Sequence, residues 1–415
     1  MGLSKKKHLP QLAGEYECTA CLACENICPK QAINHYLADD GHVYVKVDSL
    51  KCIGCLKCQK VCERSRSNYG ENNIYASKLY AAWATDDKDR ANATSGGVFA
   101  AFARTILKSG GCVIGAELNG FECKHSAIYS IDDIQRLQGS KYMASSMEEI
   151  YSTIAEELPH RDVLFSGVGC QCAGILAYFE GFKTDYKLYT VDLVCGGVPS
   201  RLLIEKFREQ NPDVNGLLSF RSKDRYELKV KTDREEKVIE EKSLPLHGFN
   251  CGLTNRYSCY NCQYAKAHRK TDITIGDLWD YSILPNEHKS GISMVIAHSS
   301  NGKELLNNSS VKKEEIGWAG VLLHNKRIVC GHQNIYMPRK RLISNYKKLS
   351  KGRFVKLYTI TMGPADIDLF SFRIIRYIKE KINKKLNEKY IGVILAQKRD
   401  NGLELPEGKC LRKLD

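Results

Sequence analysis

Two cysteine runs near the amino terminus share one spacing and decide the fold of the first part of the chain. They read Cys18-Thr-Ala-Cys21-Leu-Ala-Cys24-Glu-Asn-Ile-Cys28-Pro29 and Cys52-Ile-Gly-Cys55-Leu-Lys-Cys58-Gln-Lys-Val-Cys62. Three cysteines spaced two residues apart can wrap a cubane iron–sulfur cluster, and the fourth points back toward a second cluster. The repeated spacing therefore predicts two [4Fe–4S] clusters. Their expected ligand sets are Cys18, Cys21, Cys24 and Cys62, and Cys52, Cys55, Cys58 and Cys28.

Structural zinc is the alternative for these eight cysteines. A zinc site closes with four ligands, and its two pairs are usually separated by about twelve or more residues. Two identical four-cysteine runs fit that pattern poorly, so the spacing favours iron–sulfur clusters. The stretch from about residue 10 to residue 70 resembles the two-cluster bacterial ferredoxins, although Glu63 stands where Pro29 follows the first run. We expect a small α+β ferredoxin-like domain over residues 1–72.

Composition indicates a large globular protein with reduced cysteines. A chain of 415 residues, 43% of them hydrophobic, is long enough for two or three domains. No apolar segment follows the lysines at 5–7, and no stretch reaches the roughly 18 apolar residues that span a bilayer. We therefore expect a cytoplasmic protein whose 18 cysteines are thiols or ligands. The net charge of +14 comes with no nucleic-acid motif, so no nucleic-acid partner is expected.

Strands and helices alternate after the cysteine runs. Strands are predicted at 78–84, 112–116, 162–168 and 186–194, and helices at 98–108, 147–158, 171–179 and 200–210. This alternation predicts an α/β domain over residues 73–340, with a mostly parallel sheet and flanking helices. Residues 216–243 are charged and alternate in short runs, which favours antiparallel strands or an excursion from the sheet.

Four further cysteines form a candidate third cluster. Cys170 and Cys195 each follow a predicted strand, and the ends of neighbouring strands line the ligand crevice of an open α/β sheet. The pair Cys259-Tyr-Asn-Cys262 is half of a site, and Cys170 and Cys195 would complete it. These four thiolates predict a third [4Fe–4S] cluster, with zinc as the alternative. The cysteines without a motif are expected to be ordinary thiols; they are Cys112, Cys123, Cys330 and Cys410.

The turn Thr94-Ser95-Gly96-Gly97 opens the helix predicted at 98–108. A serine and two glycines at a helix start leave bare backbone N–H groups, which suit a phosphate or pyrophosphate. A plain N-cap with a tight turn explains the same residues equally well. Gly167-Val-Gly169 also suggests a dinucleotide loop, but Cys172 replaces the third glycine of that fingerprint, so the pattern is weak.

Several motifs in one order resemble a known family. They are Thr94-Ser-Gly-Gly97, Gly139-Ser-Lys-Tyr142, Cys170-Gln171, Asp192-Leu-Val-Cys195-Gly-Gly-Val-Pro-Ser200, Cys259-x-x-Cys262 and Asp272-Ile-Thr-Ile-Gly-Asp277. Over about residues 75–340 the chain resembles the beta-subunit family of coenzyme F420 hydrogenases and dehydrogenases, whose members often carry a fused ferredoxin. Two positions depart from that family. Val168-Gly169 stands where Thr-Pro is usual, and Cys195-Gly196-Gly197 stands where Cys-His-Gly is usual.

The resemblance implies an oxidoreductase that uses FAD and iron–sulfur clusters. Electrons would pass from a redox partner protein through the two amino-terminal clusters, the third cluster and FAD to a hydride carrier such as F420, or to another substrate. Ser95, Gly96 and Gly97 would hold FAD phosphate. Lys141 would pair with phosphate or reduced flavin, and Tyr142 would pack on the ring. Asp277 and Trp279 lie just beyond a strand, where crevice residues sit. Purely structural roles are the alternatives, and no catalytic residue is assigned.

A different class of function is a non-catalytic subunit that delivers electrons to a partner enzyme, for example in surface polysaccharide synthesis. A redox sensor is a third and weaker hypothesis. Residues 341–415 are expected to form a basic helical extension, with one amphipathic helix over 367–389. Such a helix could lie on a membrane surface or a partner, but packing on its own domain is the favoured interpretation.

Overall fold

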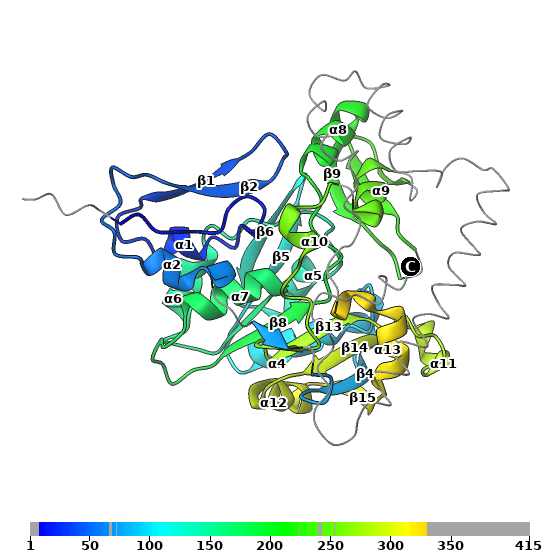
Figure 1. Cartoon of the computed structure of the whole chain (residues 1–415). Helices are drawn as coiled ribbons and strands as arrows, with labels where there is room; N and C mark the ends of the chain where they lie inside the picture. The colour runs from blue at the N-terminus through cyan, green and yellow to red at the C-terminus, as the bar shows by residue number, and fades with distance from the viewer. Residues whose placement is uncertain are drawn as a thin grey trace, which may run out of the picture.

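The computed structural model describes residues 8–65, 69–71, 73–223, 225–239, 243–252 and 254–329 (Figure 1). Its amino-terminal part is a small module of short helices and one hairpin. The elements are α1 Ala23–Asn26, β1 Ile33–Leu37, β2 Val43–Val47, α2 Lys57–Val61 and η1 Glu63–Ser65. The hairpin strands are antiparallel, with Ile33 opposite Val47. The expected α+β ferredoxin-like domain is confirmed.

One eight-stranded sheet forms the larger part of the molecule, in the order β15-β4-β14-β13-β8-β7-β5-β6. Its strands are β4 Lys78–Ala84, β5 Cys112–Asn119, β6 Glu122–Ile128, β7 Val163–Val168, β8 Leu188–Leu193, β13 Ile273–Asp277, β14 Ser293–Ala297 and β15 Val311–Glu315. The central strands β13, β8, β7 and β5 are parallel. The other strands add antiparallel at both edges. The α/β class and its parallel centre are confirmed.

Helices cover both faces of this sheet because the central strands are apolar on both sides. On one face, α4 Val98–Lys108 and α12 Ser300–Asn308 pack over Val113 and Leu164. On the other face, α6 Ile150–Glu157 and α7 Gly169–Tyr178 pack over Ile114 and Phe165. Successive strand residues thus point into opposite cores.

A smaller lobe stands at one end of the sheet (Figure 1). It holds the antiparallel strands β9 Val214–Ser219, β10 Leu228–Thr232 and β11 Glu236–Ile239, with the helices α8 Leu202–Gln210 and α9 Leu244–Cys251. Its core contains Phe207, Phe220 and Leu246. The antiparallel excursion expected for residues 216–243 is therefore present.

The remaining elements are short connections. They are β3 Gly70–Glu71, α3 Asp87–Ala91, η2 Ile131–Asp133, α5 Ile134–Leu137, α10 Tyr257–Tyr260, β12 His268–Arg269, α11 Pro285–His288, α13 Trp318–His324 and η3 Lys326–Ile328. The pairing of β3 with β12 ties the end of the cysteine module to the sheet domain.

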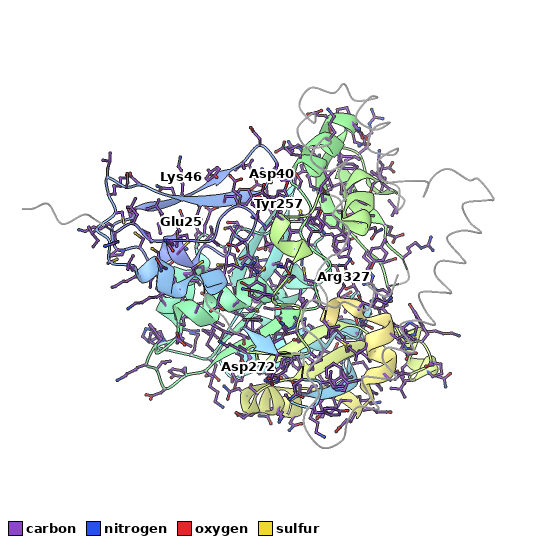
Figure 2. All side chains as sticks on the ribbon, in the orientation of Figure 1. Glu25, Asp40, Lys46, Tyr257, Asp272 and Arg327 are labelled. Atoms are coloured by element: carbon purple, nitrogen blue, oxygen red, sulfur yellow. The ribbon has the colours of Figure 1, made fainter. Side chains whose placement is uncertain are left out.

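The cysteine module shares a hydrophobic core with the sheet domain. Leu22 and Val61 pack into the same cluster as the apolar faces of α6 and α7. The Tyr151 hydroxyl donates a hydrogen bond to the Cys21 carbonyl at 2.7 Å. At the hairpin tip, the Ser200 hydroxyl donates to the Asp40 carbonyl at 2.6 Å, in the region where Figure 2 labels Asp40. These contacts fix the cysteine loops against the sheet domain.

No helix in the described part of the chain is long and apolar enough to cross a membrane. The amphipathic helix predicted at 367–389 lies outside the described residues, as do Cys330 and Cys410. Cys112 and Cys123 are buried free thiols.

Candidate iron–sulfur and flavin site

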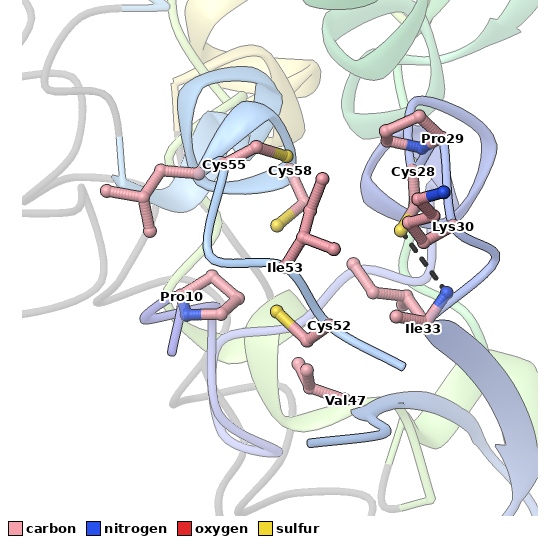
Figure 3. Close-up of a pocket in the computed structure, with 12 residues that line it drawn as sticks. Pro10, Cys28, Pro29, Lys30, Ile33, Val47, Cys52, Ile53, Cys55 and Cys58 are labelled. Carbon is pink, nitrogen blue, oxygen red and sulfur yellow. Dashed lines mark hydrogen bonds between the residues drawn. The ribbon is translucent and has the colours of Figure 1, made fainter. Parts of the chain in front are cut away.

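The structure brings the first eight cysteines together in two crossed groups. One hollow is lined by the inner set, which is Cys18, Cys21, Cys24 and Cys62. A second hollow is lined by the outer set, which is Cys28, Cys52, Cys55 and Cys58. Figure 3 shows the sulfur atoms of Cys28, Cys52 and Cys58 directed into this second hollow. Each set takes three cysteines from one run and the fourth from the other, as the spacing predicts for two cubane clusters.

Backbone amides are directed at the cysteine sulfurs. The Ala20 N–H donates to Cys18 Sγ at 3.4 Å, and the Gly54 N–H donates to Cys52 Sγ at 3.4 Å. The Ala32 N–H donates to Cys28 Sγ at 3.2 Å. Such donors stabilise a charged thiolate and tune the potential of a cluster bound to it. The residues present therefore fit anionic iron–sulfur groups.

The two loops also share an unusual backbone. Ala20 and Gly54, each two residues after the first cysteine of its run, have φ of 55° and 72°. Leu22 and Leu56, which directly precede α1 and α2, have φ of 63° and 58°. Left-handed backbone is unfavourable for alanine and leucine, so its repetition indicates a shared requirement to curl around a central group.

Burial raises the pKa of three thiols of the inner set, Cys18, Cys21 and Cys24. Burial, with smaller contributions from the neighbouring Cys18 and Cys62, raises the pKa of Cys21 to about 12. Burial also raises the pKa of Cys24, with a contribution from Cys58 of the outer set. Ligand binding to metal requires the thiolate, so cluster assembly here must release protons. Cys24 and Cys58 also lie in one buried cluster, which places the two sets beside each other.

The four later cysteines meet where two neighbouring strands end. Cys170 lies in the first turn of α7, directly after β7, and Cys195 lies two residues beyond β8. Burial raises the pKa of Cys170 well above its usual value, and Cys195, Cys262 and Cys259 raise it further. We call these four residues the sheet set. The Gly197 N–H donates to Cys195 Sγ at 3.3 Å, which repeats the amide–sulfur pattern of the loops.

A zinc site closes tightly around one ion. In a closed zinc site each sulfur lies about 2.3 Å from the ion, which holds the sulfurs within roughly 4 Å of one another. Among the described residues, no three His, Cys, Asp or Glu side chains are arranged to hold a single metal ion.

The inner set and the sheet set are in contact through α7. A Cβ added to Gly174 of α7 would lie 3.0 Å from Cys21 Sγ. The Tyr264 ring lines the hollow of the inner set and also packs against Cys170 and Cys262 of the sheet set. The three sets therefore follow one another in the order outer, inner, sheet.

A buried ion pair lies beneath the sheet set. Arg269 Nη1 is 2.8 Å from Asp192 Oδ2, with side-chain exposures of 3% and 0%. The Thr274 hydroxyl donates to the other oxygen of Asp192. A Cβ on Gly169 would already lie 3.2 Å from Asp192 Oδ2, and 3.0 Å from the Tyr264 Cβ. The glycine that replaces the usual proline before the Cys-Gln motif therefore allows this packing.

Three of the predicted flavin residues meet around an arginine that sequence reasoning missed. Arg221 Nη1 lies 2.7 Å from Asp277 Oδ2, and its guanidinium stands 5.0 Å from the centre of the Trp279 ring. The Tyr142 ring stacks on Phe249 with centroids 3.9 Å apart. Arg221 is 6% exposed at its side chain. It follows β9 of the smaller lobe, outside every motif, so only the folded chain identifies it.

Phe249 also accounts for the second departure from the family pattern. A Cβ on Gly196 would lie 2.8 Å from the Phe249 ring. A histidine at this position would therefore collide with a side chain that reaches in from α9. The aromatic pair Tyr142–Phe249 occupies the space beside Cys195 instead.

Ser95, Gly96 and Gly97 are engaged in packing α4 onto the sheet. The Ser95 hydroxyl donates to the Ile292 carbonyl at 2.8 Å, and the Gly96 N–H donates to Ser293 Oγ at 3.0 Å. A Cβ on Gly97, whose φ is 77°, would lie 2.8 Å from the Asp89 carbonyl. A phosphate at this turn would have to displace the bond from Ser95.

Lys141 points back to its own loop. Its ammonium donates to the Leu137 carbonyl at 3.0 Å and to the Gln138 carbonyl at 2.7 Å. Burial lowers the pKa of Lys141 to about 8. The adjacent Ser140 bonds Thr94 through their hydroxyls at 3.1 Å, so the loop of Lys141 touches the turn that opens α4.

Two known families match separate parts of the chain. Residues 17–65 match a 4Fe-4S dicluster domain. Residues 160–320 match the family described as the carboxyl-terminal part of the beta subunit of coenzyme F420 hydrogenase/dehydrogenase. The protein is thus an iron–sulfur electron-transfer protein. Its sheet domain is similar to the F420 hydrogenase/dehydrogenase beta-subunit family over residues 160–320 and follows a ferredoxin-type domain.

Among solved structures, the chain is similar to one from the F420-reducing [NiFe] hydrogenase complex of Methanosarcina barkeri. The two share 16% sequence identity, the match covers 68% of this chain and 89% of that chain, and the TM-score is 0.42. Comparison with curated proteins gives no match.

Proposed function

We propose that this protein is an iron–sulfur flavoprotein oxidoreductase with three [4Fe–4S] clusters and FAD. It would exchange electrons with a hydride carrier of the coenzyme F420 type. One observation carries the proposal: the outer, inner and sheet sets adjoin one another and end beyond the carboxyl ends of β7 and β8. Cofactors of open α/β sheets bind in the crevice at that edge.

For electron transfer, the protein would hold the cysteine sets close to one another and shield them from solvent. Tyr264 is 3% exposed and separates the inner set from the sheet set by one packed ring. The buried pair of Arg269 and Asp192 fixes charge beneath the sheet set. We propose domain limits of 1–72 and 73–340 for the modules that carry these sets, followed by the extension at 341–415.

A bound FAD would supply the chemistry that joins one-electron clusters to two-electron hydride transfer. Arg221, Tyr142 and Trp279 offer the cationic and aromatic contacts that such a ring requires. Asp277 holds the Arg221 guanidinium in place through the 2.7 Å bond. Ser95, Gly96, Gly97 and Lys141 remain the proposed phosphate contacts, with Ser95 and Lys141 exchanging their present bonds for the phosphate.

The family matched is that of a subunit, so we propose that a redox partner protein works with this chain. A second candidate function is an electron-transfer subunit without a flavin. The observation that favours it is the engagement of Ser95 and Gly96 in the sheet contacts. On that hypothesis, the sheet set would pass electrons directly to the partner enzyme.

Flavin content separates these two functions. The full chain would be purified without oxygen and compared with Arg221→Ala and Arg208→Ala, because Arg208 also stands over an aromatic ring, 4.5 Å from the centre of Phe121. We expect stoichiometric FAD in the wild type and in Arg208→Ala, and strongly reduced FAD in Arg221→Ala. Reduced F420 should then bleach the clusters of the wild type. Intact clusters without any flavin would reject the flavoprotein and leave the electron-transfer subunit.

A further inference from the structure

The outer set is the solvent end of the row of cysteine sets. Of the twelve predicted ligands, all of which are described, Cys55 alone is exposed. The hollow of the outer set is closed by apolar residues such as Pro10, Pro29 and Ile53 (Figure 3). A redox group at this position would be the first one that an external protein could approach.

Large apolar side chains project from the loops around this hollow. Leu50 is 91% exposed, Ile53 is 52% exposed and Leu9 is 48% exposed. Single exposed apolar residues are ordinary, but a group of them next to an exposed ligand indicates a contact surface. We call this group, with Cys55, the outer face.

Two of the segments that form the outer face carry charge of one sign. Segments 27–34 and 49–61 contain four lysines and no aspartate or glutamate. The lysines are all exposed, and they are Lys30, Lys51, Lys57 and Lys60. Two flanking carboxylates, those of Asp48 and Glu25, bind groups of the cysteine module itself. Asp48 accepts the N–H groups of Leu50 and Lys51 at 2.9 and 3.3 Å, and Glu25 pairs with His35 at 2.9 Å.

We propose that the outer face is the docking surface for a small acidic one-electron carrier protein of the ferredoxin class. Its acidic rim would pair with the lysines, and an apolar centre would meet Ile53 and Leu50. The proposal rests on the proposed function only in requiring a cluster at the outer set. In the transfer step, one electron leaves the reduced carrier, which is oxidised, and the outer cluster is reduced by that electron. No bond or proton changes place.

The size and chemistry of the face fit a transient partner. Electron-transfer encounters bury little area, and their rates depend on electrostatic steering more than on tight binding. Steering by a charged face raises association rates by about 10- to 1,000-fold at low salt. An acidic carrier would therefore be selected over a basic one, and added salt would remove that preference.

The test uses stopped-flow reduction of the full-length anaerobic protein. The probes are a reduced acidic plant-type ferredoxin, the same ferredoxin with surface carboxylates changed to lysine so that its surface is basic, and reduced methyl viologen, which needs no docking site. The variant is the double change Lys51→Glu with Lys57→Glu. Its control is Lys183→Glu with Lys289→Glu, which alters net charge equally at two exposed lysines of the sheet domain.

We expect the Lys51/Lys57 variant to be reduced by the acidic ferredoxin at least about tenfold more slowly at low salt. The control should change less than about twofold. Both variants should react normally with methyl viologen. Equal rates for the two variants, or equal rates with acidic and basic carriers, would overturn the docking surface. If methyl viologen fails to bleach the wild type, the protein holds no reducible cluster, which is a failure of the proposed function instead.

Discussion

Gly174 of α7 lies against Cys21 of the inner set: a Cβ added to Gly174 would stand 2.8 Å from the Cys21 Cβ and 2.7 Å from the Tyr151 hydroxyl. That hydroxyl holds the Cys21 carbonyl at 2.7 Å. Because Cys170 is in the first turn of the same helix, this contact sets the approach of the inner set to the sheet set. The route proposed for electrons depends on it.

Replacing Gly174 with alanine should disturb the inner set. The new methyl group must displace Cys21 or Tyr151, since both contacts are shorter than real Cβ contacts allow. We expect reduced iron content and slower transfer from the inner to the sheet set, measured by iron analysis and freeze-quench spectroscopy. Gly317→Ala is the control, because nothing lies within 4 Å of its added Cβ. Full iron and unchanged transfer in Gly174→Ala would contradict the contact.

The crossed ligand sets predict which cysteine variants behave alike. Cys62 lines the inner hollow with Cys24, although it belongs to the same run as Cys58. The spectrum of Cys62→Ser should therefore match that of Cys24→Ser and differ from that of Cys58→Ser. Electron paramagnetic resonance of the reduced proteins checks this. A Cys62→Ser spectrum that matches Cys58→Ser would show that each run binds its own cluster.

Asp192→Asn should destabilise the sheet domain strongly. The amide removes the charge that pairs with Arg269, whose side chain is 3% exposed. An uncompensated buried charge lowers the free energy of unfolding by about 3–5 kcal/mol. Denaturant unfolding under anaerobic conditions measures this change in the free energy of unfolding. The control is Glu304→Gln, which removes the charge that pairs with Lys187. The side chains of Lys187 and Glu304 are 41% and 48% exposed, so we expect little change in the free energy of unfolding. A stable Asp192→Asn protein would contradict the assigned pair.

Acid should destabilise the fold partly through His125. Burial lowers the pKa of His125 to about 4, and its Nε2–H donates to the Ser166 carbonyl at 3.1 Å. The unfolded histidine titrates near about 6.5, so only the unfolded state gains a proton between these values. The contribution of His125 to the free energy of unfolding is therefore fully present above about pH 6.5. This contribution falls by about 3 kcal/mol as the pH drops to about 4.

His125→Gln keeps an N–H donor and cannot titrate. The difference in unfolding free energy between wild type and variant should therefore narrow as pH falls from 7 to 4.5. Comparing the two proteins at each pH removes the contribution of acid-labile clusters, which both contain. A difference that stays constant across this range would mean that His125 is already exposed to protons in the native state.

Local patterns predicted local structure well. The strand at 78–84 and the helix at 98–108 form at the predicted residues, because each has a continuous apolar periodicity with clear end signals. The crossing of the cysteine sets followed from ligand geometry alone. The strand and the helix depend on residues near one another in sequence, and the crossing depends on the repeated cysteine spacing.

Contacts between distant segments were not predictable in the same way. β4 pairs with β14 and β15, more than 200 residues later, and no local pattern specifies that pairing. Arg221 reaches Asp277 only because the smaller lobe folds over the strand ends. The sequence left a phosphate contact and a plain N-cap equally open for Ser95, and it did not predict that the Ser95 hydroxyl donates to the carbonyl of Ile292, which directly precedes β14. Packing between segments far apart in the sequence determines the pairing of β4 and the contacts of Arg221 and Ser95.

Iron and acid-labile sulfide per chain test the central claim most directly. Anaerobic wild-type protein should contain about twelve irons and as many sulfides, four for each of three clusters. Cys170→Ser, which removes one ligand of the sheet set, should contain about eight while keeping the signals of the inner and outer sets. About eight irons in the wild type, unchanged by Cys170→Ser, would contradict the third cluster. Zinc in place of iron would contradict the whole row of redox centres.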